Sequence, residues 1–206
     1  MKCGVPQGSI LGPLLFNMYL SEIGKVAQKH NMNRKSFADD NQLHQAFIPK
    51  NITEKTLTVA NIKNCTTDLE IFFGQHFMKF NGVKTDGLIS GTKEKLKEVN
   101  LNEIPVGSSM IEPSNHVKNL GVYFDKEMTM EKQIQHIQMK CYSQLRRISR
   151  IRNSLNEKAT KTLVHQLVIS HLDYGNALLY GITEEKMNKL QKIQNSAARL
   201  ICKIKI

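Results

Sequence analysis

The sequence predicts an α+β fold, with helices and short strands over residues 1–126 and an all-helical region over residues 127–206. Three observations support this prediction. Hydrophobic residues make up 40% of the 206 residues, which is typical of a globular chain. Short alternating segments separated by turn residues run through the first region, and such segments favour strands. Apolar stripes with a spacing of three or four residues run through the second region and favour helices.

The first region opens with a predicted helix and a predicted hairpin. Gly12 and Pro13 are typical of a helix start, because proline suits the first helical position. Apolar residues at helical spacing continue this helix to about Val26, and a polar stretch over 30–35 ends it. The segment 37–40, Phe-Ala-Asp-Asp, then predicts a tight hairpin with an acidic tip. Two adjacent carboxylates suit a divalent metal, because hard cations prefer oxygen ligands. Aspartate is also common in turns, so simple turn formation is the alternative.

The rest of the first region predicts one more helix and short strands. Residues 51–73 favour a helix, and residues 77–81 alternate between apolar and polar. Leu88–Ile89 and Asn119–Phe124 are interpreted as short strands, the second after Pro113 and a turn.

The second region predicts three helices. Apolar residues three or four apart run from Met130 to Ile148. A second helix is expected from Asn156, and a third from Thr183, a suitable N-cap before two glutamates that fit the positive end of the helix dipole. Ordinary core packing explains all three stripes.

Charge points to a polyanionic partner. The formal net charge is +11, with 13 basic against 9 acidic residues over 1–100 and 16 against 9 over 101–206. Basic surface attracts nucleic acid without reading its sequence, although a solvated surface is the plain alternative. Four arginines lie close together, and we interpret them as phosphate contacts rather than only as cations at a helix C-terminus: Arg146, Arg147, Arg150 and Arg152.

Cysteine usage and hydropathy bear on location. The four cysteines form no CxxC pair, so neither a zinc site nor a redox motif is indicated. No apolar run approaches the ~18 residues that span a membrane, and the N-terminal residues lack the apolar stretch of a signal peptide. We therefore expect an intracellular protein, nuclear or cytoplasmic, that is not secreted and has no membrane partner.

Five ordered segments carry a family resemblance. Residues 4–16 match the pattern GVPQGSxLGPxLF at every fixed position, and residues 37–40 match the box [YF]ADD. Residues 77–86 are similar to FLKLNxxKTE, and residues 119–122 are similar to the short strand that follows it. Residues 172–174, together with 190–201, are similar to the region C-terminal to the polymerase palm. Over nearly its whole length, the chain resembles the C-terminal palm and thumb portion of reverse transcriptases of non-LTR, LINE-type retrotransposons.

The resemblance implies an RNA-directed DNA polymerase that uses Mg²⁺, deoxynucleotide triphosphates, an RNA template and a DNA primer; protein partners stay unknown. Residues 1–126 would form a truncated palm, a small antiparallel sheet with helices, and residues 127–206 an all-helical, thumb-like region. Asp39 and Asp40 would be the catalytic metal ligands. Lys84 would lie near the triphosphate, where a cation offsets charge, with an ordinary surface lysine as the alternative. The remaining roles are substrate binding by Gln7, Gly8, Ser9, Phe37 and Ala38, primer contact by Leu120, Gly121 and Val122, and duplex contact by the four arginines.

The resemblance also implies a further aspartate that the matched residues do not include. In the family it lies on a strand upstream of the glycine-rich segment, and only three residues precede Gly4 here. We therefore expect a truncated polymerase, and its enzymatic activity is left undecided. Two hypotheses stay open: a fragment of an RNA-directed DNA polymerase, and a catalytically inactive remnant that at most binds nucleic acid.

Overall fold

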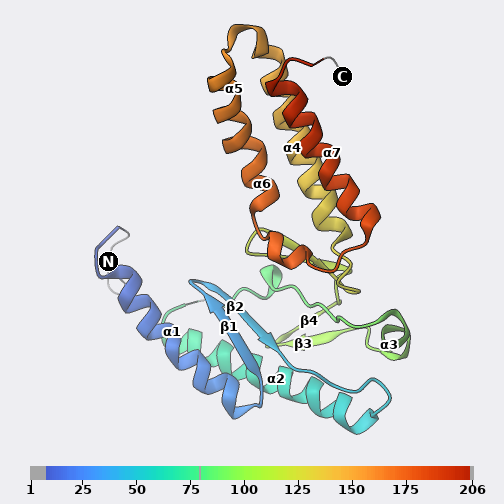
Figure 1. Ribbon diagram of the computed structural model, residues 1–206. Coiled ribbons are helices and arrows are strands. Elements are labelled where there is room, and N and C mark those ends of the chain that lie inside the picture. The colour runs from blue at the N-terminus through green and yellow to red at the C-terminus, as the bar shows by residue number, and fades with distance from the viewer. Residues whose placement is uncertain (1–7, 79, 205–206) are drawn as a thin grey trace. The chain divides into compact units, whose positions relative to one another are not determined.

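The computed structural model describes residues 8–78 and 80–204, and the chain divides into two compact units between Ser114 and Asn115. Helices are accompanied by three separate two-stranded antiparallel sheets (Figure 1). The predicted α+β class is confirmed, although the strands form three hairpins instead of one small sheet. Across the described residues, no helix combines the length and the apolar character that a membrane span needs.

The first unit is built on two packed helices. Helix α1 (Gly12–Lys29) has proline in its first turn, as the sequence predicts. Helix α2 (Ile52–Gln75) begins after Asn51, whose side-chain oxygen accepts a hydrogen bond from the Glu54 amide at 3.1 Å. The two helices share one core, whose buried members are Leu20, Ile23, Ala27, Met32, Cys65 and Leu69.

The predicted hairpin follows α1. Strands β1 (Asn33–Phe37) and β2 (Asp40–His44) pair in antiparallel register, with Phe37 opposite Asp40. Leu43 packs against the core of α1 and α2, which fixes the hairpin on those helices. The sheet has only two strands, so its outer edges are unpaired within the described residues.

The remainder of the first unit differs from the prediction. Strands β3 (Ile104–Val106) and β4 (Ser109–Ile111) were not expected, and β3 is buried beside α2. The short helices η1 (Gly82–Lys84) and α3 (Lys93–Glu98) precede them. The predicted strand at Leu88–Ile89 is wrong, because these two residues lie in no strand; the preceding Gly87 forms an isolated bridge with Pro113. The described residues of 77–81 form no strand either.

The second unit begins with a hairpin where the sequence pattern predicted a single strand. Strands β5 (His116–Asn119) and β6 (Val122–Asp125) reverse at Leu120 and Gly121, whose φ angles are +45° and +83°. Positive φ at both central residues is the mark of a type I′ hairpin turn. The predicted single strand Asn119–Phe124 therefore spans a turn. Because β6 packs on helix α4, the hairpin joins the helical unit, and the unit boundary lies before the predicted one at residue 126.

Helices form the rest of the second unit, as predicted. They are α4 (Glu131–Ile151), η2 (Arg152–Ser154), α5 (Glu157–Val164), the π-helical η3 (His165–Ile169), α6 (Ser170–Asp173), η4 (Asn176–Leu179) and α7 (Glu184–Ile201). Asn156 caps α5 by accepting from the Ala159 amide at 2.8 Å. The apolar stripe of α4 packs against α7 and the α5–α6 segment, and its buried members are Ile134, Ile137, Cys141, Leu145 and Ile148.

Candidate catalytic hairpin and nucleic-acid interface

The acidic pair lies where the sequence predicts it, at the turn of the β1–β2 hairpin. Phe37 and Asp40 close the turn, and Ala38 and Asp39 form its two central residues. Ala38 has a φ of +50°, a left-handed conformation that costs a residue with a Cβ atom about 1–2 kcal/mol. Glycine is the usual choice for such a position in a two-residue hairpin. The tip is therefore a locally strained turn that presents two carboxylates.

Both carboxylates are exposed, and hydrogen bonds of Arg34 and Asn41 form a polar clasp that holds the turn. The Asn41 side chain donates to the Asp39 carbonyl oxygen at 3.2 Å. Arg34 donates from Nε and Nη2 to the Asn41 side-chain oxygen at 3.0 and 2.7 Å, and burial lowers the pKa of this guanidinium. Within the described part of the chain, the Asp39 and Asp40 carboxylates take no part in these hydrogen bonds or in any ion pair. Their oxygens remain available to a ligand.

The tip fits part of a metal site. Adjacent carboxylates supply the hard oxygen donors that Mg²⁺ prefers, and Mg²⁺ in phosphoryl-transfer sites is often held by one or two carboxylates together with water and substrate phosphates. Across residues 8–78 and 80–204, no three His, Cys, Asp or Glu side chains gather in a group that could hold a metal ion. Asp39 and Asp40 thus supply two donors, and a complete site would draw the others from water, substrate or another segment.

The predicted substrate-binding residues are placed in part. Gln7 lies outside the described residues. Gly8 has a φ of +85° and open space around its α-carbon, and the Ser9 carbonyl accepts from the Gly12 amide at 3.2 Å at the start of α1. The Phe37 side chain is 65% exposed beside the acidic pair.

Lys84 is exposed at the end of η1. Its backbone amide is bonded to Asn81, through the carbonyl at 3.2 Å and the side-chain oxygen at 3.3 Å. No hydrogen bond or ion pair among the described residues joins Lys84 to the acidic pair. Its predicted place beside a triphosphate stays a prediction.

The three predicted primer-contact residues divide into two kinds. Leu120 and Gly121 form the exposed turn, and the Tyr174 hydroxyl donates to the Leu120 carbonyl oxygen at 2.6 Å. A Cβ atom on Gly121 would meet the Tyr174 ring at 3.4 Å, so glycine gives room as well as positive φ. Val122 is only 6% exposed and packs in the helical core. Its side chain is closed to a primer, which leaves its backbone for such a contact.

The four predicted nucleic-acid-binding arginines also separate. Arg146, Arg147 and Arg150 are exposed on α4. Arg152 is 7% exposed, and its guanidinium donates to the carbonyl oxygens of Leu200, Leu155 and Ile201 at 2.9, 2.9 and 2.7 Å. The prediction that Arg152 contacts a phosphate is wrong, because these hydrogen bonds occupy its guanidinium inside the protein. The exposed cluster therefore has three members.

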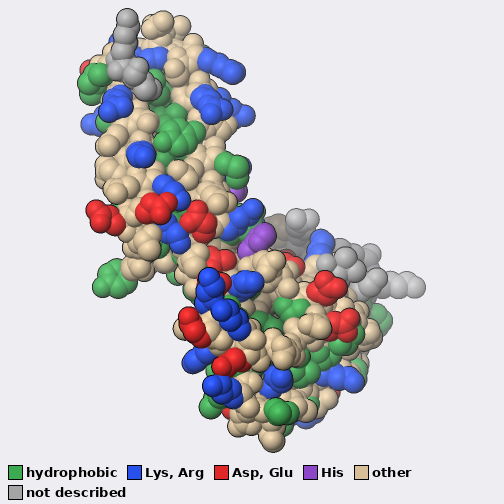
Figure 2. Space-filling view, turned by 90° about the vertical axis from the view of Figure 1, so that its right-hand side faces the viewer, with side chains coloured by type: hydrophobic (Ala, Val, Ile, Leu, Met, Phe, Trp, Pro, Cys, Tyr) green, Lys and Arg blue, Asp and Glu red, His purple; other side chains and the backbone are tan. Residues whose placement is uncertain are grey.

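The helical unit holds most of the positive charge. Residues 115–206 contain 16 basic and 7 acidic residues, a net +9 of the total +11. In Figure 2, the charged side chains at the end of this unit that carries the C-terminus of α4 are mostly Lys and Arg, and carboxylates gather lower on the unit. That end is strongly cationic and would attract polyanions in general.

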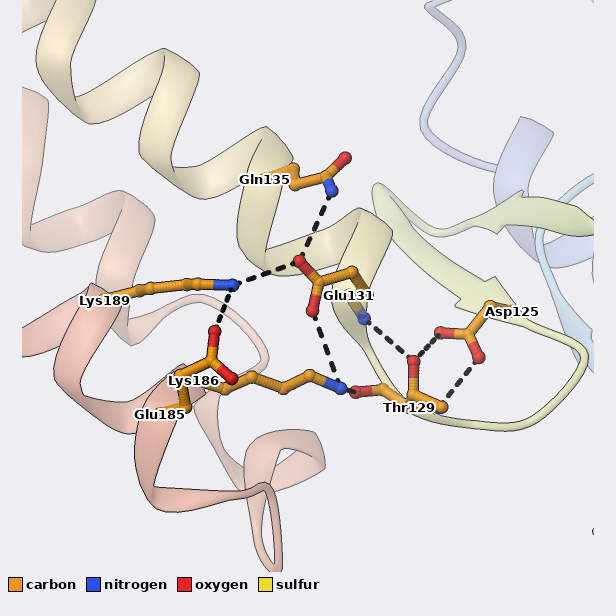
Figure 3. A network of polar contacts seen from close by, with 7 residues as sticks. All are labelled: Asp125, Thr129, Glu131, Gln135, Glu185, Lys186 and Lys189. Atoms are coloured by element: carbon orange, nitrogen blue, oxygen red, sulfur yellow. Dashed lines mark hydrogen bonds and ion pairs between the residues drawn. The ribbon is translucent and has the colours of Figure 1, made fainter.

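A polar network that the sequence did not predict fixes the start of α4 (Figure 3). Asp125 accepts from the Thr129 amide at 2.8 Å, and Lys186 of α7 donates to the Thr129 carbonyl at 2.7 Å. Glu131 lies 3.4 Å from Lys189 and 3.7 Å from Lys186. Burial alone would raise the pKa of Glu131, but hydrogen bonds and the two lysines lower it overall. The network joins α7 to the loop between β6 and α4.

Comparison with curated proteins identifies related chains. The protein is 26% identical over 212 residues, 98% of its length, to a probable RNA-directed DNA polymerase from transposon BS of Drosophila melanogaster. It is 26% identical over 213 residues to a probable RNA-directed DNA polymerase from the transposon X-element of the same organism. The chain spans 22% of the length of each of these relatives. No family model and no solved structure matches it. The predicted resemblance to reverse transcriptases of non-LTR retrotransposons is confirmed.

Proposed function

We propose that this chain is a segment of an RNA-directed DNA polymerase, in which the β1–β2 hairpin contributes two metal-binding carboxylates and the helical unit contacts the primer–template backbone. One observation supports it above all: in a chain related over 98% of its length to such polymerases, Asp39 and Asp40 lie exposed at the tip of a two-residue turn. Residues 1–114 would then be part of a palm, and residues 115–206 a thumb with an adjoining hairpin.

Each group has a stated task in this proposal. Asp39 and Asp40 would hold Mg²⁺ through their carboxylate oxygens. When bound, the metal would stabilise negative charge on the attacking 3′-oxygen and the leaving pyrophosphate. Lys84 would offset charge on the triphosphate, and the Leu120–Gly121 turn would contact the primer. The exposed arginines would hold the duplex without reading its sequence, since phosphate contacts position a nucleic acid rather than specify it.

A second candidate function is nucleic-acid binding without catalysis. It is favoured by the two-carboxylate tip, which gathers no third metal-binding side chain from the described residues. It is disfavoured by the polar clasp of Arg34 and Asn41, which shapes the turn while leaving both carboxylates open. Both candidates share the contact between the helical unit and a duplex.

Primer extension separates the two. Two proteins are assayed on an RNA template with a DNA primer and Mg²⁺. One is this chain by itself, and the other, the exchanged protein, is the transposon BS polymerase with this chain in place of its matching segment. We expect incorporation by the exchanged protein, and a loss of about 10²–10³-fold in Asp39→Asn, a factor typical of removing one transition-state stabilising group. Glu103→Gln is the matched control, an exposed carboxylate away from the tip. Duplex binding without incorporation would establish the second candidate instead.

A further inference from the structure

We propose that His136, Lys118 and Tyr123 form a second phosphate-binding site for a nucleic-acid strand, one that gains affinity when His136 takes up a proton. The inference rests on the nucleic-acid contact of the helical unit proposed above, but it does not require catalysis.

The cluster is built around one aromatic ring. Tyr123 of β6 is half-buried, and its ring centroid lies 5.1 Å from that of His136 on α4. On β5, Lys118 Nζ lies 5.6 Å from the Tyr123 ring centroid, and the His116 ring lies 6.3 Å away. Three basic side chains from two elements thus gather at a single tyrosine, which meets the His136 ring in a T-shaped contact and Lys118 in a cation–π contact.

Among the described residues, four basic groups lower the pKa of His136 by their charge. Lys132 and Lys140 lie on its own helix, four residues to each side, Lys118 faces it from β5, and His171 faces it from α6. Burial lowers the pKa of His136, and these neighbours lower it further. The imidazole is therefore neutral near pH 7. A bound anion would reverse this balance, because it stabilises the imidazolium, and binding would take up a proton.

The occupant that fits best is a strand of backbone phosphates. His136 and Arg147 are eleven residues apart on α4, or about three helical turns, so they share one face with ~16 Å between them. Lys140 lies between them on that face and is exposed. The cluster and Arg147 are therefore two ends of one cationic row, a length that repeated phosphates would occupy and a single phosphate ion would not.

Binding measured against pH tests the proposal. Fluorescence anisotropy of the full chain with a labelled DNA duplex is compared at pH 7.5 and 5.5, at a constant 0.1 M salt. One added phosphate contact predicts about fivefold to tenfold tighter binding at pH 5.5. His136→Gln should lose most of this gain, whereas His165→Gln, at an exposed histidine of the same unit away from the cluster, should keep it. An equal gain in the two variants, or none in the natural chain, would overturn the proposal.

A second measurement needs no variant. The His136 ring is titrated by NMR in the unbound chain, with the duplex, and with inorganic phosphate at matched ionic strength. The duplex should raise the apparent pKa of His136, and inorganic phosphate should leave it unchanged. An equal rise with inorganic phosphate would assign the site to a free anion, and no rise with either would remove it. Because both readouts are binding, an inactive polymerase in the extension assay does not affect them.

Discussion

Arg152 carries a positive charge but is not placed to contact a nucleic acid. It lies close in sequence to three exposed arginines, yet its guanidinium is buried and holds three carbonyl oxygens, two of them at the end of α7. A cation at a helix C-terminus is favoured by the helix dipole and by the unpaired carbonyls there. Arg152 thus ties the end of α4 to the end of α7 and belongs to the stability of the unit.

Replacing Arg152 should therefore weaken folding and not the intrinsic affinity for a duplex. In Arg152→Ala the three carbonyls lose a charged donor inside the protein, and we expect about 2–3 kcal/mol less free energy of unfolding. Urea denaturation followed by circular dichroism measures this loss. Arg146→Ala is the matched control and should change stability by about 0.5 kcal/mol or less. The assignment fails if Arg152→Ala leaves the unfolding midpoint unchanged and lowers duplex affinity instead.

The sequence contains a signal that separates Arg152 from its neighbours. Its position is four residues after Ile148, so it continues the buried stripe of α4, whereas Arg146 and Arg147 fall off that stripe. Counting arginines could not show this, but helical phase could. The acidic tip was predicted correctly for a related reason, because adjacent aspartates after a short strand are a local signal. The clasp of Arg34 on Asn41 depends on strand register and was not predicted.

At the scale of elements, tertiary contacts decide where the sequence pattern fails. The β3–β4 hairpin is tied to α2, where Gly107 donates to the Thr66 hydroxyl at 2.8 Å and Ser108 donates to Glu70 at 2.9 Å. A Cβ atom on Gly107 would lie 2.6 Å from the Glu70 carboxylate and would displace it from the Ser108 amide, and the φ of +57° also favours glycine there. These partners are about forty residues away in sequence, so no local periodicity could predict the contacts. Helices α1, α2 and α4 carry long stripes or caps of their own and were predicted correctly.

The contact between α1 and α2 makes the first unit sensitive to acid. Asp68 of α2 lies 2.8 Å from both Lys29 Nζ and His30 Nε2 at the end of α1, and hydrogen bonds from these two groups lower its pKa. A carboxyl whose folded pKa is depressed stabilises the fold above its unfolded value, near 3.8, and loses that effect as pH falls through the folded pKa.

Comparison with Asp68→Asn measures this contribution. We expect the natural chain to be more stable than the variant between about pH 5 and 7, and the difference to shrink toward zero as the pH falls below the unfolded pKa. Thermal unfolding of both proteins from pH 7 to below pH 3.8 measures this difference in stability. Glu22→Gln, on the exposed side of α1 and paired with the exposed Lys25, is the control and should show little pH-dependent difference. A stability gap that stays constant down to low pH would contradict the assignment to Asp68.

At the scale of the whole molecule, the acidic pair and most of the positive charge lie in different units. The first unit carries the acidic pair with a net charge of +2, from 13 basic and 11 acidic residues, and the second carries +9. The sequence predicted an excess in the second half. Only the unit boundary at residue 115 shows how unequal the division is, because it moves the acidic residues before Asn115 to the first unit. Polyanion binding should therefore depend on the second unit nearly alone.

The salt dependence of binding tests this division in the intact chain. Changing Arg146, Arg147 and Arg150 together to alanine removes three exposed cations, and each phosphate contact contributes about 0.9 to the slope of log affinity against log salt for duplex DNA. We expect the slope to fall by about 2.7. The matched control removes the same charge from α3 of the first unit, through alanine at Lys93, Lys95 and Lys97, all of which are exposed. It should leave the slope nearly unchanged. Equal losses in the two variants would mean that net charge alone attracts the duplex, and the helical unit would then have no interface of its own.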